Sequence, residues 1–215
     1  MESNRDLVAH LKRCGYIRTS KVEDSFLKID RRLFVDAPSA GSAYEDCPLP
    51  IISGGTISAP SIVALMSEAL LVRDGDRILE VGAGSGYQAA ILSFLVGKRG
   101  KVFTTEIVPQ LWDYSRERLK KFRNVSVACT DGSVGLGEKA PFDKIIVTAA
   151  CPELPRPLVG QLKDGGIIIA PVEGFFCQNL IRATKKGGKV FCENICPVIF
   201  VPLIGRHGYS EKRIC

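Results

Sequence analysis

Arg77-Ile-Leu-Glu-Val-Gly-Ala-Gly-Ser-Gly-Tyr-Gln-Ala-Ala-Ile91 is the stretch of this sequence that decides the fold. Its apolar residues 78–81 predict a short strand, and residues 86–96 predict a helix. Between them lie three glycines, Gly82, Gly84 and Gly86. A strand, a tight glycine loop and a helix start form the unit with which α/β domains build a nucleotide-type pocket.

The glycine spacing indicates which kind of ligand this loop accepts. A dinucleotide fingerprint would place its third glycine at position 87, which is Tyr87. The pattern Glu80-x-Gly82-x-Gly84-x-Gly86 instead resembles motif I of the class I S-adenosylmethionine (AdoMet) methyltransferases. Close backbone approach suits the amino-acid end of AdoMet, and Glu80 can meet its ammonium group directly or through water. On the glycines alone, a glycine-rich turn of another α/β protein remains an alternative.

The residues around the loop predict a doubly wound α/β fold with a mostly parallel sheet. Residues 1–36 read as helical, and the apolar residues 62, 65, 66, 69 and 70 predict a further helix that starts near residues 58–60 and ends near residues 74–75. Strands are then expected at 77–81, 101–105, 125–129, 143–148 and 166–172, with a helix at 109–122. Residues 178–184 and 189–200 flank a Lys-Lys-Gly-Gly turn, which indicates a C-terminal β-hairpin.

Acidic residues end successive strands of this predicted sheet. Glu106 ends the second strand, where one carboxylate could accept hydrogen bonds from both hydroxyls of a ribose. Asp131 ends the third strand and could accept from an adenine amino group, and Gly132 would let the ring lie against backbone. Each acid alone is more often a solvated loop residue or a helix cap. Three of them beside a glycine loop favour AdoMet binding, because ligands of open α/β sheets bind at the carboxyl ends of the strands.

Composition limits the class of protein. The chain has 215 residues, of which 46% are hydrophobic, enough for one domain with a full core. Its net charge of +6 is spread along the chain without a run of five or six like charges, so it is weak support for a nucleic-acid partner. We find neither a signal-peptide pattern nor an apolar run long enough to span a membrane, and we expect a cytoplasmic protein.

Eight cysteines raise the question of a metal or a disulfide framework. They form no Cys-x-x-Cys pair, and the chain has only two histidines, His10 and His207. We therefore expect no metal site, and we expect reduced thiols that fill core positions.

Two segments before the glycine loop resemble one particular family. Residues 43–51 read Ala-Tyr-Glu-Asp-Cys-Pro-Leu-Pro-Ile, and residues 56–60 read Thr-Ile-Ser-Ala-Pro. Together with residues 79–92, 105–109, 131–132, 140–150, 155–166 and 201–205, they are similar to the protein-L-isoaspartate O-methyltransferases. The resemblance spans about residues 20–208. Two positions depart from it: Gly55 stands where many members have Gln, and Ser61 where many have His.

This resemblance implies one methyltransferase domain with a seven-stranded sheet of the class I, Rossmann-like type, N-terminal helices and a C-terminal hairpin. Residues 1–75 would form a helical, substrate-side segment, residues 76–172 the AdoMet-binding core, and residues 173–215 the hairpin and substrate edge. The implied activity is protein repair: the methyl group of AdoMet is transferred to the free α-carboxylate of an L-isoaspartyl residue. The methyl ester then closes to a succinimide, which hydrolyses partly to normal aspartate. Isoaspartyl proteins and peptides would be the partners, and we expect a monomer.

The resemblance also implies roles for particular residues. Ser58 would be the catalytic residue, and residues 201–203 would add backbone groups to the peptide-binding edge. The AdoMet site would comprise Gly55, Thr56, Ile57, Ser58, Glu80, Gly82, Gly84, Gly86, Glu106, Asp131 and Gly132.

The chemistry is compatible with a small hydroxyl at this place. A substrate carboxylate is already ionised at pH 7, since its pKa is about 4, so it needs no general base. It needs alignment with the methyl group and the sulfur in a dry pocket. Ser58 could hold one carboxylate oxygen while the other attacks. Local sequence alone favours Ser58 as a plain N-cap, with Pro60 at the helix start, and the family resemblance reverses this preference.

Two rival functions remain. A methyltransferase acting on nucleic acid commonly carries an Asn/Asp-Pro-Pro-Tyr motif after the fourth strand, where this chain has Thr148-Ala149-Ala150-Cys151 without an aromatic residue to stack a base. A non-catalytic AdoMet-binding relative of the repair enzyme is the second rival. The presence of Ser58, Glu80, Glu106 and Asp131 counts against it, and Gly55 and Ser61 keep it open.

Overall fold

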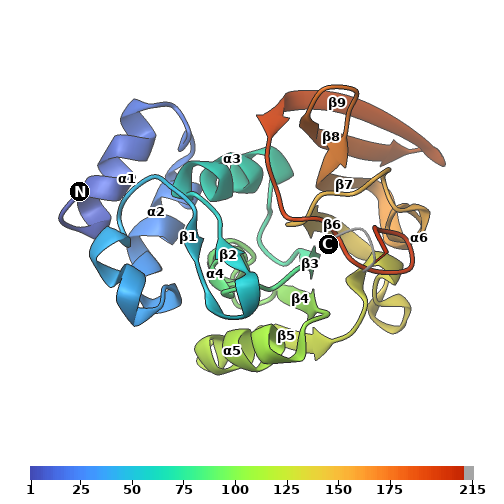
Figure 1. Ribbon diagram of the computed structural model, residues 1–215. Coiled ribbons are helices and arrows are strands. Elements are labelled where there is room, and N and C mark those ends of the chain that lie inside the picture. The colour runs from blue at the N-terminus through green and yellow to red at the C-terminus, as the bar shows by residue number, and fades with distance from the viewer. Residues whose placement is uncertain (211–215) are drawn as a thin grey trace.

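The chain folds around one seven-stranded sheet, which confirms the predicted α/β architecture (Figure 1). The computed structural model describes residues 1–210. The strand order is β5-β4-β3-β6-β7-β8-β9, in which neighbours from β5 to β7 pair in parallel and β8 and β9 pair antiparallel. The strands are β3 (Arg77–Val81), β4 (Lys101–Glu106), β5 (Val125–Cys129), β6 (Phe142–Val147), β7 (Leu162–Glu173), β8 (Gln178–Lys186) and β9 (Lys189–Val198).

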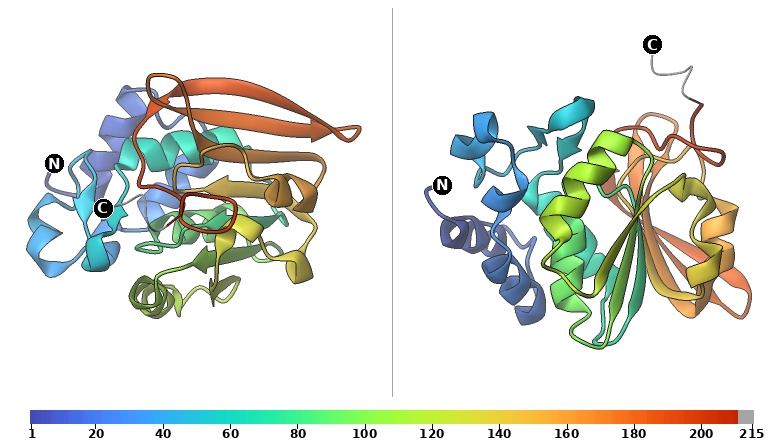
Figure 2. Two further views of the ribbon diagram at one scale, coloured as in Figure 1. Left: turned by 45° about the vertical axis from the view of Figure 1, so that its right-hand side comes forward. Right: turned by 90° about the horizontal axis from the view of Figure 1, so that it is seen from below.

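Helices cover both faces of the sheet, with most of them on one side (Figure 2). The larger core lies on that side, where α3 and α4 pack against the two N-terminal helices and α5 packs against β4 and β5. On the other face, Leu158 of α6 packs into a second core with Leu79, Val81 and Phe142. The helices are α1 (Asn4–Arg13), α2 (Ser20–Lys28), α3 (Pro60–Leu70), α4 (Tyr87–Leu95), α5 (Pro109–Leu119) and α6 (Arg156–Gln161).

The glycine loop lies where the strand order reverses. The chain leaves β3 toward β4 on one side, and β6 later returns to pair with the other side of β3. In an open parallel sheet this switch point is where the loops after the strands diverge and leave a crevice. The fold therefore brings the ends of β3, β4, β5 and β6 to one edge.

The hairpin forms as its turn residues predict. Gly187 and Gly188 both have positive φ, 57° and 74°, which a two-residue hairpin turn requires. The flanking strands pair from Lys186 with Lys189 to Gln178 with Val198. The turn is also tied to β7, because the Gly187 amide donates to the Asp164 carboxylate at 2.7 Å.

Two elements are absent from the sequence-based prediction. β1 (Leu49–Pro50) pairs with β2 (Thr56–Ile57) in a small antiparallel sheet ahead of α3. The proline-rich stretch after β6 contains α6, whose N-cap is Pro155. Both elements are short, and prolines interrupt the periodicity that would have indicated them.

The expected role of the cysteines is wrong for most of them. Within residues 1–210 the cysteines are free thiols, and only Cys151 is buried. Cys14, Cys129, Cys177 and Cys192 are exposed. Cys215 lies outside the described residues.

Candidate active site

The glycine loop needs glycine at all three positions for its backbone shape. Gly82, Gly84 and Gly86 have φ values of 98°, 50° and 86°, a region that other residues rarely adopt. A Cβ at Gly82 would also collide with the hydroxyl of Thr148, at the end of β6. That hydroxyl lies 2.6 Å from the Gly82 carbonyl oxygen, to which it donates a hydrogen bond. Thr148 thus fixes the start of the loop, and sequence reasoning gave it no role.

Glu106 holds the middle of the glycine loop. Its Oε2 accepts a hydrogen bond from the Gly84 amide at 2.9 Å. Its Oε1 accepts from the amides of Ile107 and Val108 at 2.9 and 3.1 Å. The carboxylate is therefore fixed at the carboxyl end of β4, beside the loop, where it was predicted to meet a ribose.

Glu80 is a buried carboxyl without a partner. Its side chain is inaccessible to solvent, and neither carboxyl oxygen makes a hydrogen bond within the described part of the chain. Burial raises its pKa to about 8, and the charge of Glu106 adds to the rise. The neighbouring Thr104 hydroxyl has the opposite effect, although its Oγ1 makes no hydrogen bond. Native proteins rarely leave such a group unpaired, so the site lacks a donor here.

Asp131 joins the end of β5 to the C-terminal loop. Its Oδ1 accepts from the Ser133 amide at 2.8 Å, and its Oδ2 accepts from the Arg206 amide at 2.7 Å. Burial alone would raise the pKa of Asp131, but these hydrogen bonds and the nearby His207 hold it below its ordinary value. The carboxylate is thus ionised and rigidly placed.

Tight packing explains why residue 132 is a glycine, and this explanation differs from the predicted one. A Cβ at this position would overlap the Thr105 hydroxyl and lie 2.7 Å from Cγ1 of Val81. The glycine lets residue 132 pack against the ends of β3 and β4. We had expected it to leave room for an adenine ring.

The segment before α3 lies against the glycine loop. A Cβ on Gly84 would lie 3.8 Å from the backbone oxygen of Thr56, so β2 and the loop are in contact range. Thr56 is exposed, and Ile57 is buried with 2% of its surface accessible. The pairing of β1 with β2 holds both residues at this place, as Leu49 pairs with Ile57.

Ser58 is not the N-cap of α3. The cap position is Ala59, and Pro60 is the first helical residue. The carboxylate of Asp46 takes the capping role, since its Oδ1 accepts from the Ser61 amide at 2.8 Å. Within residues 1–210 the hydroxyl of the half-buried Ser58 makes no hydrogen bond, so it is free to bind a ligand. Asp46 belongs to the segment that carries the family resemblance, but nothing in its spacing from Ser61 indicated a cap.

Gly55 and Ser61, the two positions that depart from the family pattern, lie in different surroundings. A Cβ at Gly55 would lie 3.1 Å from Ile51 and 3.2 Å from Leu111, which is a tight fit. Glycine therefore suits the local packing against α5. Ser61 is buried in the first turn of α3 and receives the Asp46 cap through its amide.

The backbone of residues 201–203 is largely occupied. The Ala150 amide donates to the Val201 carbonyl, and the Leu203 amide donates to the Ala150 carbonyl, both at 2.8 Å. These bonds fix the segment beside the end of β6. The Val201 carbonyl and the Leu203 amide are thus engaged with Ala150.

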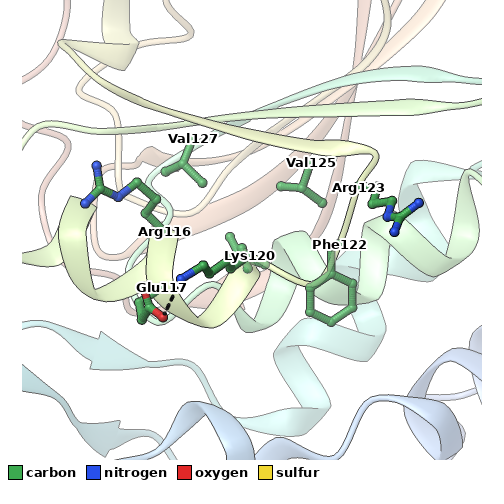
Figure 3. A pocket seen from close by; sticks show the side chains of 8 residues that line it. Arg116, Glu117, Lys120, Phe122, Arg123, Val125 and Val127 are labelled. Atoms are coloured by element: carbon green, nitrogen blue, oxygen red, sulfur yellow. Dashed lines mark hydrogen bonds and ion pairs between the residues drawn. The ribbon is translucent and has the colours of Figure 1, made fainter.

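Two surface clefts lie away from these residues. The first, of about 390 Å³, is drawn in Figure 3 between the end of α5 and β5. The second, of about 440 Å³, shares Glu117 and Lys120 with it. Neither cleft is lined by a candidate site residue. The first is lined by Arg116, Glu117, Leu119, Lys120, Phe122, Arg123, Val125 and Val127.

The described residues contain no group of three or more His, Cys, Asp or Glu that could hold a metal ion. The helices within residues 1–210 are also all too short or too polar to cross a membrane.

Comparisons with known proteins identify the family of this chain. A curated protein-L-isoaspartate O-methyltransferase from Ignicoccus hospitalis is 47% identical over 208 residues, which cover 94% of this chain and 98% of that protein. One from Methanococcus aeolicus is 43% identical over 96% of each chain. The crystal structure of a protein-L-isoaspartate O-methyltransferase from Plasmodium falciparum, in complex with S-adenosyl-L-homocysteine, superposes with a TM-score of 0.86 at 30% identity. That match covers 95% of this chain and 99% of the other. The profile of the protein-L-isoaspartate (D-aspartate) O-methyltransferase family matches residues 2–208, and the chain belongs to this family.

Proposed function

We propose that the strand-end site transfers a methyl group from AdoMet to the α-carboxylate of an L-isoaspartyl residue, with Ser58 as the residue that orients this carboxylate. Family membership makes the chain an AdoMet-dependent protein-L-isoaspartate O-methyltransferase, a repair enzyme of isoaspartyl proteins. The observation that carries the role of Ser58 is its free hydroxyl two residues after Thr56, whose backbone lies against Gly84 of the glycine loop.

The residues at the site fit AdoMet. Its ammonium group would supply the donor that buried Glu80 lacks, because an ionised carboxylate out of water needs a charged partner. Glu106 would accept from the ribose hydroxyls and Asp131 from the adenine amino group. Gly55, Thr56, Ile57, Gly82, Gly84, Gly86 and Gly132 would line the same site with backbone and small side chains.

When bound, AdoMet supplies a methyl group on a positively charged sulfur. The protein has to bring a carboxylate oxygen of the substrate in line with that methyl group and exclude water. The Ser58 hydroxyl would donate a hydrogen bond to the other oxygen of the same carboxylate. No residue needs to remove a proton, since the carboxylate is already ionised at pH 7.

The expectations about state and location are also part of this proposal. We propose a single methyltransferase domain that works as a monomer in the cytoplasm, with damaged proteins rather than nucleic acid as its partners. The lack of an aromatic residue in the sequence 148–151 supports the preference for protein over a nucleic-acid base.

Replacing Ser58 with alanine tests its role. One hydrogen bond to a charged group is worth about 1.5–3 kcal/mol, so Ser58→Ala should lower kcat by roughly ten- to a hundredfold. S-adenosyl-L-homocysteine affinity and the melting temperature should stay nearly unchanged, because Ser58 neither caps α3 nor bonds to a neighbour through its hydroxyl. Ser20→Ala, at the start of α2, is the matched control and should keep its turnover. Full turnover of Ser58→Ala would contradict the role, and loss of S-adenosyl-L-homocysteine binding would place Ser58 in the AdoMet site instead.

A further inference from the structure

Arg31 is a buried cation next to the segment that carries Ser58. It opens the 3₁₀ helix Arg31–Phe34 after α2, and its surface is entirely inaccessible to solvent. Its Nη1 donates to the carbonyls of Ala43 and Glu45, at 2.7 and 3.3 Å. Its Nη2 donates to the carbonyls of Cys47 and Ser58, at 2.9 and 3.2 Å.

No carboxylate among residues 1–210 forms an ion pair with Arg31. Burial lowers the pKa of its guanidinium, while the nearby groups of Tyr87, Cys47 and Asp46 act in the opposite direction. An isolated buried charge is costly, so the backbone carbonyls that surround Arg31 have to compensate for its lost hydration. A guanidinium is suited to this because its donors diverge in one plane.

The contacts of Arg31 join two parts of the site. Residues 43–47, which we call the strap, are held by three of its hydrogen bonds, and the strap in turn supplies Asp46, the cap of α3. The fourth bond holds the carbonyl of Ser58, immediately before α3. A second contact ties the strap to the start of the 3₁₀ helix Arg31–Phe34, since the Tyr44 hydroxyl donates to the carboxylate of its N-cap, Asp30, at 3.1 Å.

We propose that Arg31 is a positioning residue for methyl transfer: by holding the Ser58 carbonyl and the strap together, it sets the place of the Ser58 hydroxyl. This inference rests on the proposed role of Ser58. It predicts that Arg31 affects the rate of transfer through Ser58 and has little effect on AdoMet binding, because its hydrogen bonds reach none of Gly82, Gly84 and Gly86.

Arg31→Lys keeps the positive charge and removes the planar fork. A single ammonium cannot reach carbonyls on both the strap and Ser58 in the same way, so the Ser58 backbone loses its fixed position. We expect kcat to fall roughly ten- to a hundredfold, because a small displacement of a group at the reacting centre lowers the rate by about this much. The dissociation constant for S-adenosyl-L-homocysteine should change by less than about threefold, because the hydrogen bonds that hold Glu106 and Asp131 do not involve Arg31. All rates are normalised to the binding-competent fraction, measured by titration with S-adenosyl-L-homocysteine, so that partial unfolding does not count as a loss of rate.

A double-mutant cycle with Ser58→Ala separates positioning from general stability. If Arg31 acts through Ser58, Arg31→Lys should reduce kcat little further in the Ser58→Ala background. If the two losses multiply, Arg31 does not act through Ser58 and the inference is overturned, while the role of Ser58 stands. If Ser58→Ala alone keeps full kcat, the proposed role of Ser58 fails and the inference fails with it.

Arg118→Lys provides the matched control. Arg118 is a partly buried arginine with an ion pair to Asp36 at 3.4 Å, and none of its hydrogen bonds reaches the strap or Ser58. Its substitution should lower the melting temperature without changing the normalised kcat. Should Arg31→Lys fail to bind S-adenosyl-L-homocysteine, Arg31→Gln takes its place in the cycle. If that variant also loses binding, Arg31 supports the whole site and the inference is contradicted.

Discussion

The Glu106 carboxylate accepts a hydrogen bond from the Gly84 amide at 2.9 Å, and this bond fixes a negative charge close to the buried Glu80. Burial together with this charge raises the pKa of Glu80 to about 8. In the absence of a ligand, Glu80 is therefore mostly protonated at neutral pH. A cationic ligand would reverse this preference, since an opposite charge favours the ionised form.

AdoMet binding should accordingly release a proton. With a pKa of about 8, Glu80 is protonated in about nine-tenths of the molecules at pH 7, and pairing with the ammonium group ionises it. Calorimetry of S-adenosyl-L-homocysteine binding in buffers of different ionisation enthalpy should detect nearly one proton released. Glu80→Gln should bind more weakly and release none. An equal proton release by both proteins would show that Glu80 is not the group involved.

The same carboxyl should make the ligand-free protein less stable as pH rises. Its pKa is raised from 4.5 when unfolded to about 8 when folded, so the folded state binds more protons between these values. The stabilising contribution is complete below pH 4.5 and is lost as pH rises through 8, with a slope of at most about 1.4 kcal/mol per pH unit. Urea unfolding at several pH values should show this slope for the parent chain and a flatter profile for Glu80→Gln. Identical pH profiles for the two proteins would show that Glu80 does not cause the slope.

Asp131 should hold the C-terminal loop through its two backbone contacts. Asp131→Asn weakens the acceptors for Ser133 and Arg206, so amides of residues 203–209 should exchange faster with solvent and S-adenosyl-L-homocysteine should bind more weakly. Because its folded pKa is depressed, its stabilisation is present above pH 3.8 and is lost as pH falls through the lower folded value. Asp164→Asn, which weakens a similar bond to Gly187 in the hairpin turn, should leave ligand binding unchanged. Equal effects of the two variants on binding would remove Asp131 from the site.

The glycine loop should tolerate no side chain at Gly82. In Gly82→Ala, the positive φ of 98° is strained and the new Cβ overlaps the Thr148 hydroxyl, so binding of S-adenosyl-L-homocysteine should be lost. Gly15→Ala has a similar φ of 77° with nothing within 4 Å of the new Cβ. It should lose only about 1 kcal/mol of stability and bind normally. Normal binding by folded Gly82→Ala would mean that the loop backbone is not part of the site.

Thiol labelling should reflect burial. Cys151 is buried, and desolvation raises its pKa to about 12, so it should react with a thiol reagent only on unfolding. Cys14, Cys129, Cys177 and Cys192 are exposed and should react in the native state. Mass mapping of the labelled peptides checks both expectations, and rapid labelling of Cys151 would contradict the packing around it.

The sequence predicted the elements that carry a strong local signal. The strands Arg77–Val81 and Val125–Cys129 have the predicted bounds, because apolar runs between glycine or acidic loops determine them. The same pattern located Glu80, Glu106 and Asp131 at strand ends, but it could not show that Glu80 is fully buried without a partner. Burial depends on α3 and α4, which cover that face of the sheet.

Interactions across long stretches of chain could not be predicted. Ser58 had the local pattern of a cap, yet the side chain of Asp46, brought close by the β1–β2 hairpin, takes that role. Arg31 and Thr148 bind backbone carbonyls of residues distant in sequence, and neither a propensity nor a periodicity indicates such contacts. The prediction that the cysteines fill core positions was wrong for a related reason. Composition indicates that the thiols are reduced, but it does not show which of them are buried.

A paired incubation shows whether the protein methylates isoaspartate selectively. The protein is incubated with AdoMet labelled in the methyl group and with two peptides that differ only in an L-isoaspartyl or a normal aspartyl residue. The free α-carboxylate of isoaspartate and the β-carboxylate of aspartate lie on different arms of the backbone, so only the first should fit between Ser58 and the methyl group. We expect label in the isoaspartyl peptide, as a base-labile ester, and none in its aspartyl twin. Equal labelling of the two peptides, or no labelling of either by protein that binds S-adenosyl-L-homocysteine, would contradict it.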